Sequence, residues 1–581
     1  MRRARAWTGK RPSVLLGVMA VVYLVGCGEG PGGDGDTRGI APPLEDAEDG
    51  PIALEYVCGN RFFITNSYSV PVSLLYRVVG STEEGAADLP SAPVDEPAMS
   101  ERMIETRTRG ALQLFMNGKL IAVRENGAIP CSPVPANADF ASGDPSSAGE
   151  WTAPFFWPIV SVHLSLLPNG KVLAFGHHGS PQVWDPSSGD FTAVPAPALL
   201  FCAGHTFAPD GRLIVAGGHI SNAHGIPDIT IFGTGAPSWT TSTPMQLGRW
   251  YPTNTPMGNG EIVITAGKDQ NGKQVKIPEV WSPSGLRQLT TASMALPYYP
   301  RAFQAPDGKM FVAGPNQATK WLDISGTGRW TNGPKRLFGS REYGAAVMYD
   351  EGKILYVGGG HTTNTAEIIN LRDGSPQWAW TGSMAFPRRH GNAVILPTGQ
   401  VLAVGGVSGS ASNDLSTAVH PAEMWNPATG VWTMLAGNTT NRGYHTTAIL
   451  LPDGRVLLSG SGDGAGAPNE KNSEIFSPPY LFQGPRPNIG SVPSSIGYGS
   501  SFDVQTSDAG SIARVSLIRI GSTTHAFDMN QRFQKLSFSK GGSEVHVSAP
   551  DDPNIAPPGH YLVFLVDDNG VPSIGKIVEL N

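Results

Sequence analysis

Short apolar runs separated by tight turns dominate this chain, and one such unit occurs seven times. Each unit places a turn such as Pro-Asp-Gly before an apolar run that ends in a glycine cluster, as in residues 209–218 (PDGRLIVAGG). Glycine supplies the positive φ of such turns, and short apolar runs between turns are typical of strands. The turn glycines, 41 to 55 residues apart, are Gly170, Gly211, Gly260, Gly308, Gly352, Gly399 and Gly454.

This repeat predicts the architecture of the chain's centre. Helical periodicity is nearly absent, and a period in the forties with paired glycines and aromatic punctuation fits kelch-type blades of about four strands. We expect a seven-bladed kelch-type β-propeller over residues 136–483. A β-solenoid or a row of tandem sandwiches is the alternative, although each unit is too long for one solenoid coil.

The flanking segments also predict β-structure, so the expected fold is all-β. Residues 484–581 alternate in short strands, which indicates an immunoglobulin-like β-sandwich. Residues 51–135 indicate a small β-domain with strand-like runs at 70–79 and 111–123. The 72 glycines, 50 prolines and 15% charged residues fit turn-rich β-structure. The net charge of −7 argues against a nucleic-acid partner. We expect a monomer.

The N-terminus carries a targeting signal. A basic start and an apolar run at 14–25, too short to span a membrane comfortably, lead into Gly26-Cys27. This stretch resembles the lipobox of bacterial lipoproteins, which implies a signal peptide over 1–27, acylation of Cys27 and a flexible tether over 28–50. The protein is then exported and held at the bacterial cell envelope, at the outer membrane or cell surface, by its lipid alone. A plain secretory signal, and hence a secreted protein, is the alternative.

Four cysteines are present, and two of them have other predicted roles. Lipidation would use Cys27, and Cys202 lies at a special position of the repeat. Cys58 and Cys131 remain, one near each end of the small β-domain. In an exported protein this predicts a disulfide between them, with two free buried thiols as the alternative.

Candidate chemistry gathers at one position of the repeat, nine residues before each turn glycine and ten in the last unit. We call these the ring positions, because symmetry places equivalent residues of a propeller in a ring. Six of the seven carry a metal-ligating or redox-capable residue, which makes the ring a candidate active site. The residues are Ser161, Cys202, Tyr251, Tyr299, Tyr343, His390 and Tyr444, with His445 beside the last.

Four motifs in order match one family. They are residues 201–204 (FCAG), 249–253 (RWYPT), 443–456 (GYHTTAILLPDGRV) and 516–532, which contains Thr524-His525. With them the chain resembles the copper radical oxidases, galactose oxidase and glyoxal oxidase, over about residues 150–581. The resemblance implies one copper ion and a protein radical, because oxidising an alcohol or an aldehyde hydrate takes two electrons and copper accepts one.

The resemblance also assigns roles. It makes Tyr251 an equatorial copper ligand joined to Cys202 by a thioether, the cross-linked pair being the radical cofactor. His445 and His525 become the other equatorial protein ligands, and imidazole with phenolate suits Cu(II). Tyr444 becomes the axial ligand and the general base for the substrate hydroxyl. Since His525 lies beyond the propeller, its loop must reach into the central channel.

The residues expected around the substrate differ from those of galactose oxidase. A tryptophan of that enzyme that stacks on the cross-linked tyrosine has no counterpart at the expected place in residues 281–287. His390 replaces an aromatic pocket residue, Arg301 matches a substrate-binding arginine loosely, and Tyr299 and Tyr343 line the channel. Residues 249–252 look more like glyoxal oxidase. We therefore expect small aldehydes or primary alcohols as substrates, with O2 as acceptor and hydrogen peroxide as product.

The rival interpretation is a catalytically inert kelch propeller that serves as a surface binding or adhesion protein. A degenerate module should have lost some ligands, and all five residues of the expected centre are present. A further group of histidines follows glycine clusters at spacings that fit no standard ligand set, so we expect them in surface loops. They are His177, His178, His219, His224 and His361.

Overall fold

The computed structural model describes residues 52–58, 61–66, 71–89, 100–108, 110–124, 143–235, 237–410, 414–464 and 468–581. The predicted signal peptide and tether lie outside these residues, as do Cys27 and Cys131, and the side chain of Cys58 is not described. The predicted lipidation and disulfide therefore stay predictions. Within the described residues, no helix is both long enough and apolar enough to cross a membrane.

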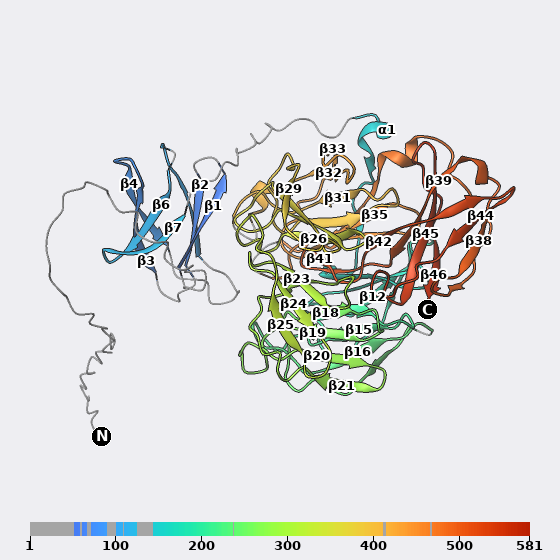
Figure 1. Cartoon of the computed structure of the whole chain (residues 1–581), viewed down its shortest axis with the longest axis horizontal. Coiled ribbons are helices and arrows are strands. Elements are labelled where there is room, and N and C mark those ends of the chain that lie inside the picture. Colours follow the sequence, from blue (N-terminus) through green and yellow to red (C-terminus); the bar gives the residue numbers. More distant parts are fainter. Residues whose placement is uncertain are drawn as a thin grey trace, which may run out of the picture. The chain divides into compact units, whose positions relative to one another are not determined.

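The fold is all-β, as predicted. Helical structure in the described part of the chain is confined to α1 (Pro145–Ala148) and the short 3-10 turns η1 (Leu415–Thr417), η2 (Pro479–Phe482) and η3 (Ala509–Ser511). Seven antiparallel sheets make the blades, and in the first six the four strands pair in sequence order. The third blade can be followed in Figure 1 as β18, β19, β20 and β21.

The strands of the first four blades are short and bounded by the predicted glycine turns. Their first and second strands are both buried throughout, and the second strands are the predicted apolar runs. The strands are β10 His163–Leu166, β11 Val172–Phe175, β12 Gln182–Trp184, β13 Phe191–Ala193; β14 Gly204–Phe207, β15 Leu213–Ala216, β16 Ile229–Phe232, β17 Trp239–Thr241; β18 Thr253–Pro256, β19 Ile262–Thr265, β20 Glu279–Ser282, β21 Gly285–Gln288; β22 Arg301–Gln304, β23 Met310–Gly314, β24 Lys320–Asp323 and β25 Arg329–Asn332.

The last three blades repeat this plan, and the seventh borrows strands from the start of the propeller. There, Trp151 pairs with Phe476 and Phe155 with Ser473, so the two ends of the propeller are joined in one sheet. The strands are β26 Ala345–Asp350, β27 Lys353–Val357, β28 Ala366–Asn370, β29 Ala379–Thr381; β30 Asn392–Ile395, β31 Val401–Val404, β32 Pro421–Trp425, β33 Trp432–Gly437; β34 Thr446–Leu450, β35 Val456–Gly460, β36 Asn472–Ser477, β8 Glu150–Trp151 and β9 Phe155–Phe156.

The C-terminal segment forms two sheets around an apolar core of its own, as expected for the predicted sandwich. One sheet has the order β37-β46-β45-β39-β42 and the other β38-β44-β43. The strands are β37 Ser495–Ile496, β38 Ser501–Gln505, β39 Ile512–Arg519, β42 Phe533–Leu536, β43 Phe538–Lys540, β44 Glu544–Ser548, β45 Gly559–Asp567 and β46 Lys576–Leu580.

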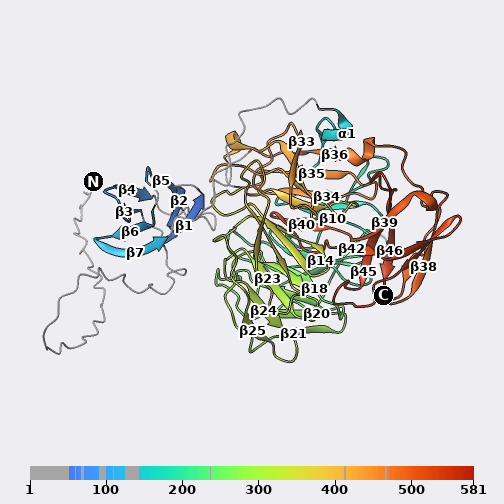
Figure 2. The same cartoon turned by 45° about the horizontal axis from the view of Figure 1, so that its top comes forward.

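A hairpin of this C-terminal segment enters the propeller. Its strands are β40 (Ser522–Thr524) and β41 (Phe527–Asp528), and β40 pairs with β10, extending the first blade by two strands. Figure 2 shows β40 beside β10 and β34. The predicted loop that carries His525 therefore does reach the propeller interior. It does so as a paired, buried hairpin with His525 at its turn.

The small N-terminal β-domain contains the two strand-like runs that the sequence predicts. Its sheets have the orders β1-β2-β5 and β4-β3-β6-β7, and buried aliphatic and aromatic side chains of both form one core. The strands are β1 Ile52–Cys58, β2 Arg61–Asn66, β3 Val72–Val78, β4 Glu84–Leu89, β5 Ser100–Glu105, β6 Leu112–Met116 and β7 Lys119–Arg124.

Candidate functional site

The ring positions share a strained backbone conformation. They lie just before the innermost strands, and from the second blade to the seventh the residue nine positions before the turn glycine has a positive φ, which residues other than glycine seldom adopt. Such strain persists only where surrounding structure enforces it, and it clusters at functional sites. The φ values are 61° for Cys202, 65° for Tyr251, 43° for Tyr299, 52° for Tyr343, 60° for His390 and 67° for His445.

The seventh blade corrects one sequence-based assignment. A count of ten residues selects Tyr444 as its ring position, but the positive φ belongs to His445. His445 lies nine residues before Gly454, the spacing found in every other unit. Tyr444 is thus an additional residue next to the ring position, and one turn presents both a phenol and an imidazole.

Buried ion pairs hold four of these turns in place. An arginine two residues before the ring position of the third, fifth and sixth blades, and two before Tyr444 in the seventh, reaches a glutamate on the third strand of its own blade. Each pair is almost wholly buried, and its arginine also donates to a backbone carbonyl. These additional hydrogen bonds offset part of the cost of burying the charges. The N–O distances are 3.0 Å for Arg249–Glu279, 2.8 Å for Arg341–Glu367, 2.9 Å for Arg388–Glu423 and 3.0 Å for Arg442–Glu474.

Neighbouring turns are also joined through the backbone. The N–H of Tyr251 donates to the carbonyl of Cys202 at 2.9 Å, and the N–H of Tyr299 donates to the carbonyl of Tyr251 at 3.1 Å. The Cys202 thiol is free and fully buried, in one apolar cluster with Tyr251 and Trp250. The equal repeat phase of Cys202 and Tyr251 thus makes them direct neighbours, as the sequence predicts.

Two phenols and two imidazoles meet at the centre of the ring. The hydroxyl groups of Tyr251 and Tyr444 are in direct hydrogen-bonding contact, and Nε2 of His525 lies 3.1 Å from the Tyr251 hydroxyl. The rings of His445 and His525 are 4.7 Å apart between centroids. All four residues are at most 4% exposed. The structure therefore brings together, from three separate parts of the chain, the side chains that the sequence singled out as ligands.

Both imidazoles are oriented by hydrogen bonds at Nδ1. Nδ1 of His445 donates to the carbonyl of Gly462 at 2.6 Å, which leaves Nε2 as the acceptor nitrogen. The Thr524 hydroxyl donates to the carbonyl of Val162 and so accepts from Nδ1 of His525 at 2.6 Å. Nε2 of His445 is buried and has no hydrogen-bond partner among the described residues. A buried nitrogen lone pair without a donor is unfavourable unless something else occupies it.

Comparison with known proteins identifies the family. Residues 360–480 match the Glyoxal oxidase N-terminus model, and residues 486–580 match the Galactose oxidase-like, Early set domain model. The chain is 31% identical over 467 residues to Aldehyde oxidase GLOX of Vitis pseudoreticulata, a match that covers 72% of this chain and 89% of that protein. The chain belongs to the galactose oxidase and glyoxal oxidase family. This family consists of copper-dependent oxidases.

Two further relatives agree with this membership. Galactose oxidase of Gibberella zeae is 28% identical over 522 residues, which cover 80% of this chain and 75% of that protein. A solved structure of a novel fungal alcohol oxidase with catalytic diversity among the AA5 family, in complex with copper, has a TM-score of 0.70 and 26% identity. It covers 75% of this chain and 100% of the solved chain.

The donor set of this family member fits copper. Two imidazole Nε2 atoms and two phenol oxygens converge, and such a mixed N,O set suits Cu(II). Burial is the largest cause that raises the pKa of Tyr251 well above its usual range, and the neighbouring Cys202 and Tyr444 raise it further. Without a metal this phenol stays neutral, so a cation is needed to stabilise the phenolate that ligation requires.

Trp250 replaces the missing stacking tryptophan. Its indole lies on the Tyr251 ring with centroids 3.8 Å apart and planes 9° apart, while its Nε1 donates to Nδ1 of His219 at 3.2 Å. The sequence places no tryptophan after the third-blade strand, and the structure supplies one from the residue before the tyrosine. Sequence reasoning missed it because adjacent side chains normally point apart, and the positive φ of Tyr251 removes that rule here.

The residues predicted to bind substrate lie close to the phenols, but they differ in how many hydrogen-bonding groups they have left for a substrate. Tyr299, Arg301 and Tyr343 line a pocket with Tyr251, together with Tyr298, Pro315 and Glu342. The Arg301 guanidinium is buried and makes four hydrogen bonds to carbonyls, of Tyr299, Gly344 (twice) and His525. Most of its donors are therefore used by backbone carbonyls, and one of them holds the carbonyl of His525.

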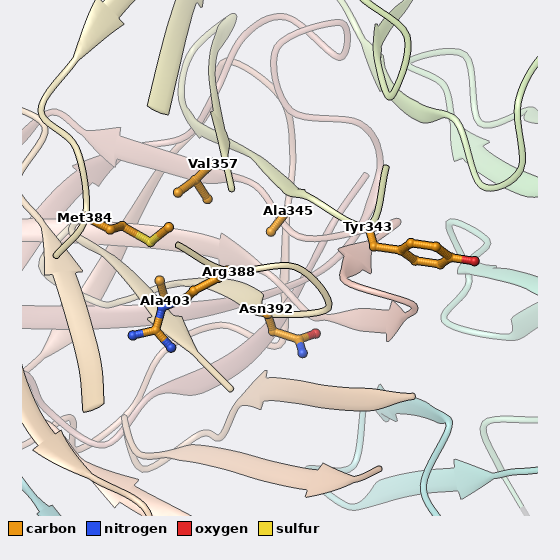
Figure 3. Close-up of a pocket in the computed structure, with 8 residues that line it drawn as sticks. Tyr343, Ala345, Val357, Met384, Arg388, Asn392 and Ala403 are labelled. Atoms are coloured by element: carbon orange, nitrogen blue, oxygen red, sulfur yellow. The ribbon is translucent and has the colours of Figure 1, made fainter. Parts of the chain in front are cut away.

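His390 and Tyr343 lie side by side near Tyr444. Their rings are 4.3 Å apart, and the ring of His390 is 5.1 Å from that of Tyr444. Nε2 of His390 is buried without a hydrogen-bond partner among the described residues. A second small pocket lies between the fifth and sixth blades, lined by Ala345, Val357, Met384, Arg388, Asn392 and Ala403 among others. Figure 3 shows the Tyr343 side chain extending away from Val357, Met384 and Arg388.

Two of the histidines expected in surface loops are buried. His219 and His361 are 8% and 7% exposed, and His177 is half-buried, whereas His178 is exposed. They lie in the loops between the second and third strands of their blades, which begin at the same end of the blade as the ring positions. The expectation of surface loops is therefore wrong for His219 and His361.

Proposed function

We propose that this chain is a copper radical oxidase that oxidises small aldehydes or primary alcohols with O2 and produces hydrogen peroxide. Its cofactors are one copper ion, held by Tyr251, Tyr444, His445 and His525, and a thioether-linked Cys202–Tyr251 radical. The observation that carries the proposal is the central cluster. Two oriented imidazoles and two phenols meet there, and a buried free thiol lies beside one phenol. An inert binding module gives no reason for this combination.

The chain's residues would divide a two-electron oxidation between them. Copper, when bound, supplies a Lewis acid for the substrate oxygen and an acceptor for one electron. Tyr444, at the centre of the cluster, would take the hydroxyl proton of the substrate as general base. The Tyr251–Cys202 radical would take a hydrogen atom from the substrate carbon and so remove the second electron. Dioxygen would take up the two electrons and two protons and leave as hydrogen peroxide.

The surroundings of Tyr251 favour a persistent radical. A thioether sulfur on the phenol ring makes it easier to oxidise, and Trp250 covers one face of that ring. His525 and Tyr299 contribute further rings, at 4.7 Å each from Tyr251. Burial excludes water and reductants from the phenol, which is 2% exposed.

The pocket beside Tyr251 supports a small substrate. Three tyrosine rings and Pro315 provide apolar walls, and the carboxylate of Glu342 adds a polar group. Most of the donors of Arg301 are already used, so this pocket offers little of the polar network that a sugar needs. The names of two relatives, an aldehyde oxidase and an alcohol oxidase, support small aldehydes or primary alcohols as substrates. Nε2 of His390 would hydrogen-bond the substrate oxygen.

The proposal also includes the predicted domain boundaries and the N-terminal targeting segment. Residues 136–483 and 484–581 form the oxidase, while residues 1–27 direct export and residues 28–50 tether the chain to the lipid on Cys27. A disulfide between Cys58 and Cys131 would stabilise the domain over 51–135 in an oxidising compartment. N-terminal mass mapping of the exported protein, without reduction, tests both modifications.

His525→Ala tests the proposed function most sharply, because His525 comes from outside the propeller. The variant should bind less copper and produce no peroxide from small aldehydes or primary alcohols, while the propeller still folds. His224→Ala, in a loop of the second blade, is the matched control and should behave like wild type. A folded His525→Ala protein with wild-type copper content and oxidase rate would overturn the assignment. Absence of peroxide from copper-loaded, cross-linked wild type with every substrate class would favour the binding-module alternative.

A further inference from the structure

Two loops beside the proposed copper site bring together three groups that commonly ligate metal ions. His177 and His178 lie between β11 and β12, and Asp463 lies between β35 and β36. One ligand atom from each lies within 4.8 Å of the other two. We propose that His177, His178 and Asp463 form a second metal site for a first-row divalent cation that favours imidazole, such as Cu(II) or Zn(II). This inference goes beyond the oxidase function.

Asp463 gives the cluster its charge. The residue is 2% exposed, and a buried carboxylate is costly unless it is paired. It accepts the backbone N–H of His177 at 2.7 Å and lies 2.5 Å from Nδ1 of His178. Its φ of 60° is in the left-handed region, and the preceding Gly462 and Ser461 also have positive φ. This strained loop therefore holds a charged oxygen against two imidazoles.

The cluster faces solvent on one side and the proposed copper site on the other. The His178 side chain is 68% exposed, so a cation from solution can reach it. The His177 ring stacks on Phe201, with centroids 4.5 Å apart, and Phe201 meets the His445 ring at 5.4 Å. A single aromatic ring thus separates the outer cluster from a ligand of the inner site.

The two sites also share a loop. Asp463 directly follows Gly462, whose carbonyl accepts the hydrogen bond that orients His445. A cation on Asp463 would neutralise the buried carboxylate and fix the loop that sets this orientation. The outer site is thereby placed to receive copper from solution next to the residues that bind it finally.

A second cluster within the described residues sets a useful contrast. Asp503, Glu544 and His546 also bring ligand atoms within 4.8 Å of one another, on the C-terminal sandwich. Nδ1 of His546 pairs with Asp503 at 2.6 Å, much as His178 pairs with Asp463, but Asp503 is exposed whereas Asp463 is buried. This group needs no cation to balance a buried charge, so we expect it to bind weakly, and it serves as the control site.

Counting bound copper in the full-length protein tests the proposal. After dialysis against Cu(II), removal of loosely bound metal and one-electron reduction of any Tyr251 radical, wild type should hold two copper ions per chain, with two distinct Cu(II) signals by electron paramagnetic resonance. His178→Ala and Asp463→Asn should each hold one and lose the same signal. Asparagine keeps the shape of aspartate and tolerates a positive φ, so the loop should survive. His224→Ala and His546→Ala should still hold two.

Each outcome decides the question. One copper in wild type, unchanged in His178→Ala, overturns the outer site, and so does a second copper that is lost in His546→Ala and kept in His178→Ala. If Asp463→Asn does not fold, the exposed His178→Ala decides alone. Failure of the proposed oxidase site has a different signature, because the inner copper depends on His525 and the outer one on His178. His525→Ala should therefore keep the outer signal.

Discussion

The indole of Trp250 lies flat on the phenol ring of Tyr251, with ring centroids 3.8 Å apart and planes 9° apart. Adjacent residues achieve this because Tyr251 has a φ of 65° and its N–H is tied to the Cys202 carbonyl. A ring that is held parallel to a phenol can stabilise its oxidised form and shield it from solvent. One turn of the third blade therefore supplies both the proposed radical and its cover.

Replacing Trp250 by leucine should shorten the life of the radical without unfolding the protein. An aromatic pair contributes about 0.5–1.5 kcal/mol beyond burial, and losing that energy from the barrier to radical decay would shorten the lifetime about two- to thirteenfold. Trp250→Phe should lie between the two, since it keeps a ring but loses the hydrogen bond to His219. Decay of the optical radical band after oxidation measures this. Trp239→Leu, in the second blade, is the control, and equal lifetimes in all four proteins would contradict the role of Trp250.

Arg442→Met should destabilise the propeller strongly. The change leaves Glu474 as a buried charge without its partner, for which a loss of about 3–5 kcal/mol in the free energy of unfolding is typical. Changing both residues to methionine should recover much of that loss. Arg455→Met removes a half-buried pair with Asp453 and should cost less than about 1 kcal/mol. Urea unfolding compares the four proteins, and equal losses for the two single variants would contradict this account.

The buried pair His163 and His205 should make the metal-free protein sensitive to acid. Nε2 of His163 accepts the N–H of Cys202, so its Nδ1 donates to Nε2 of His205 at 3.0 Å. Nδ1 of His205 then donates to the Ser522 hydroxyl at 2.5 Å, and both imidazoles are neutral in the folded state. Burial lowers the pKa of His205 to about 3 and also lowers that of His163 well below its usual range.

The unfolded chain would take up protons on these two histidines below a pH of about 6.5, whereas the folded state would not. The stability that they contribute is thus present above that pH and is lost as the pH falls. The thermal unfolding midpoint should drop between pH 7.5 and pH 5, and His205→Gln should flatten this dependence. A slope unchanged in His205→Gln would show that other groups cause the acid sensitivity.

The sequence was sufficient to predict the blades and most of the central cluster. The turn glycines set a phase, and residues nine positions before them meet because equivalent positions of the blades surround one centre. Tyr444 needed a count of ten, and the backbone shows why: His445 holds the ring position, and Tyr444 is the additional residue.

Contacts that follow no repeat could not be predicted. Asp463 and His178 are 285 residues apart, and only the closure of the propeller brings the first and seventh blades together. The role of Arg301 depended on which carbonyls surround it, which its place in the repeat does not reveal. The stacking of Trp250 on Tyr251 could not be predicted, because adjacent side chains usually point apart and only the positive φ of Tyr251 brings these two together.

The central claim is that Cys202 and Tyr251 form a cross-linked redox cofactor on copper binding. Peptide mapping after exposure to copper in air, with full reduction and alkylation, tests it most directly. We predict that the peptides containing Cys202 and Tyr251 stay joined and that the product is two hydrogen atoms lighter than their sum. Protein kept free of copper should give two separate peptides. Recovery of separate, alkylated Cys202 from the copper-treated protein would contradict the account.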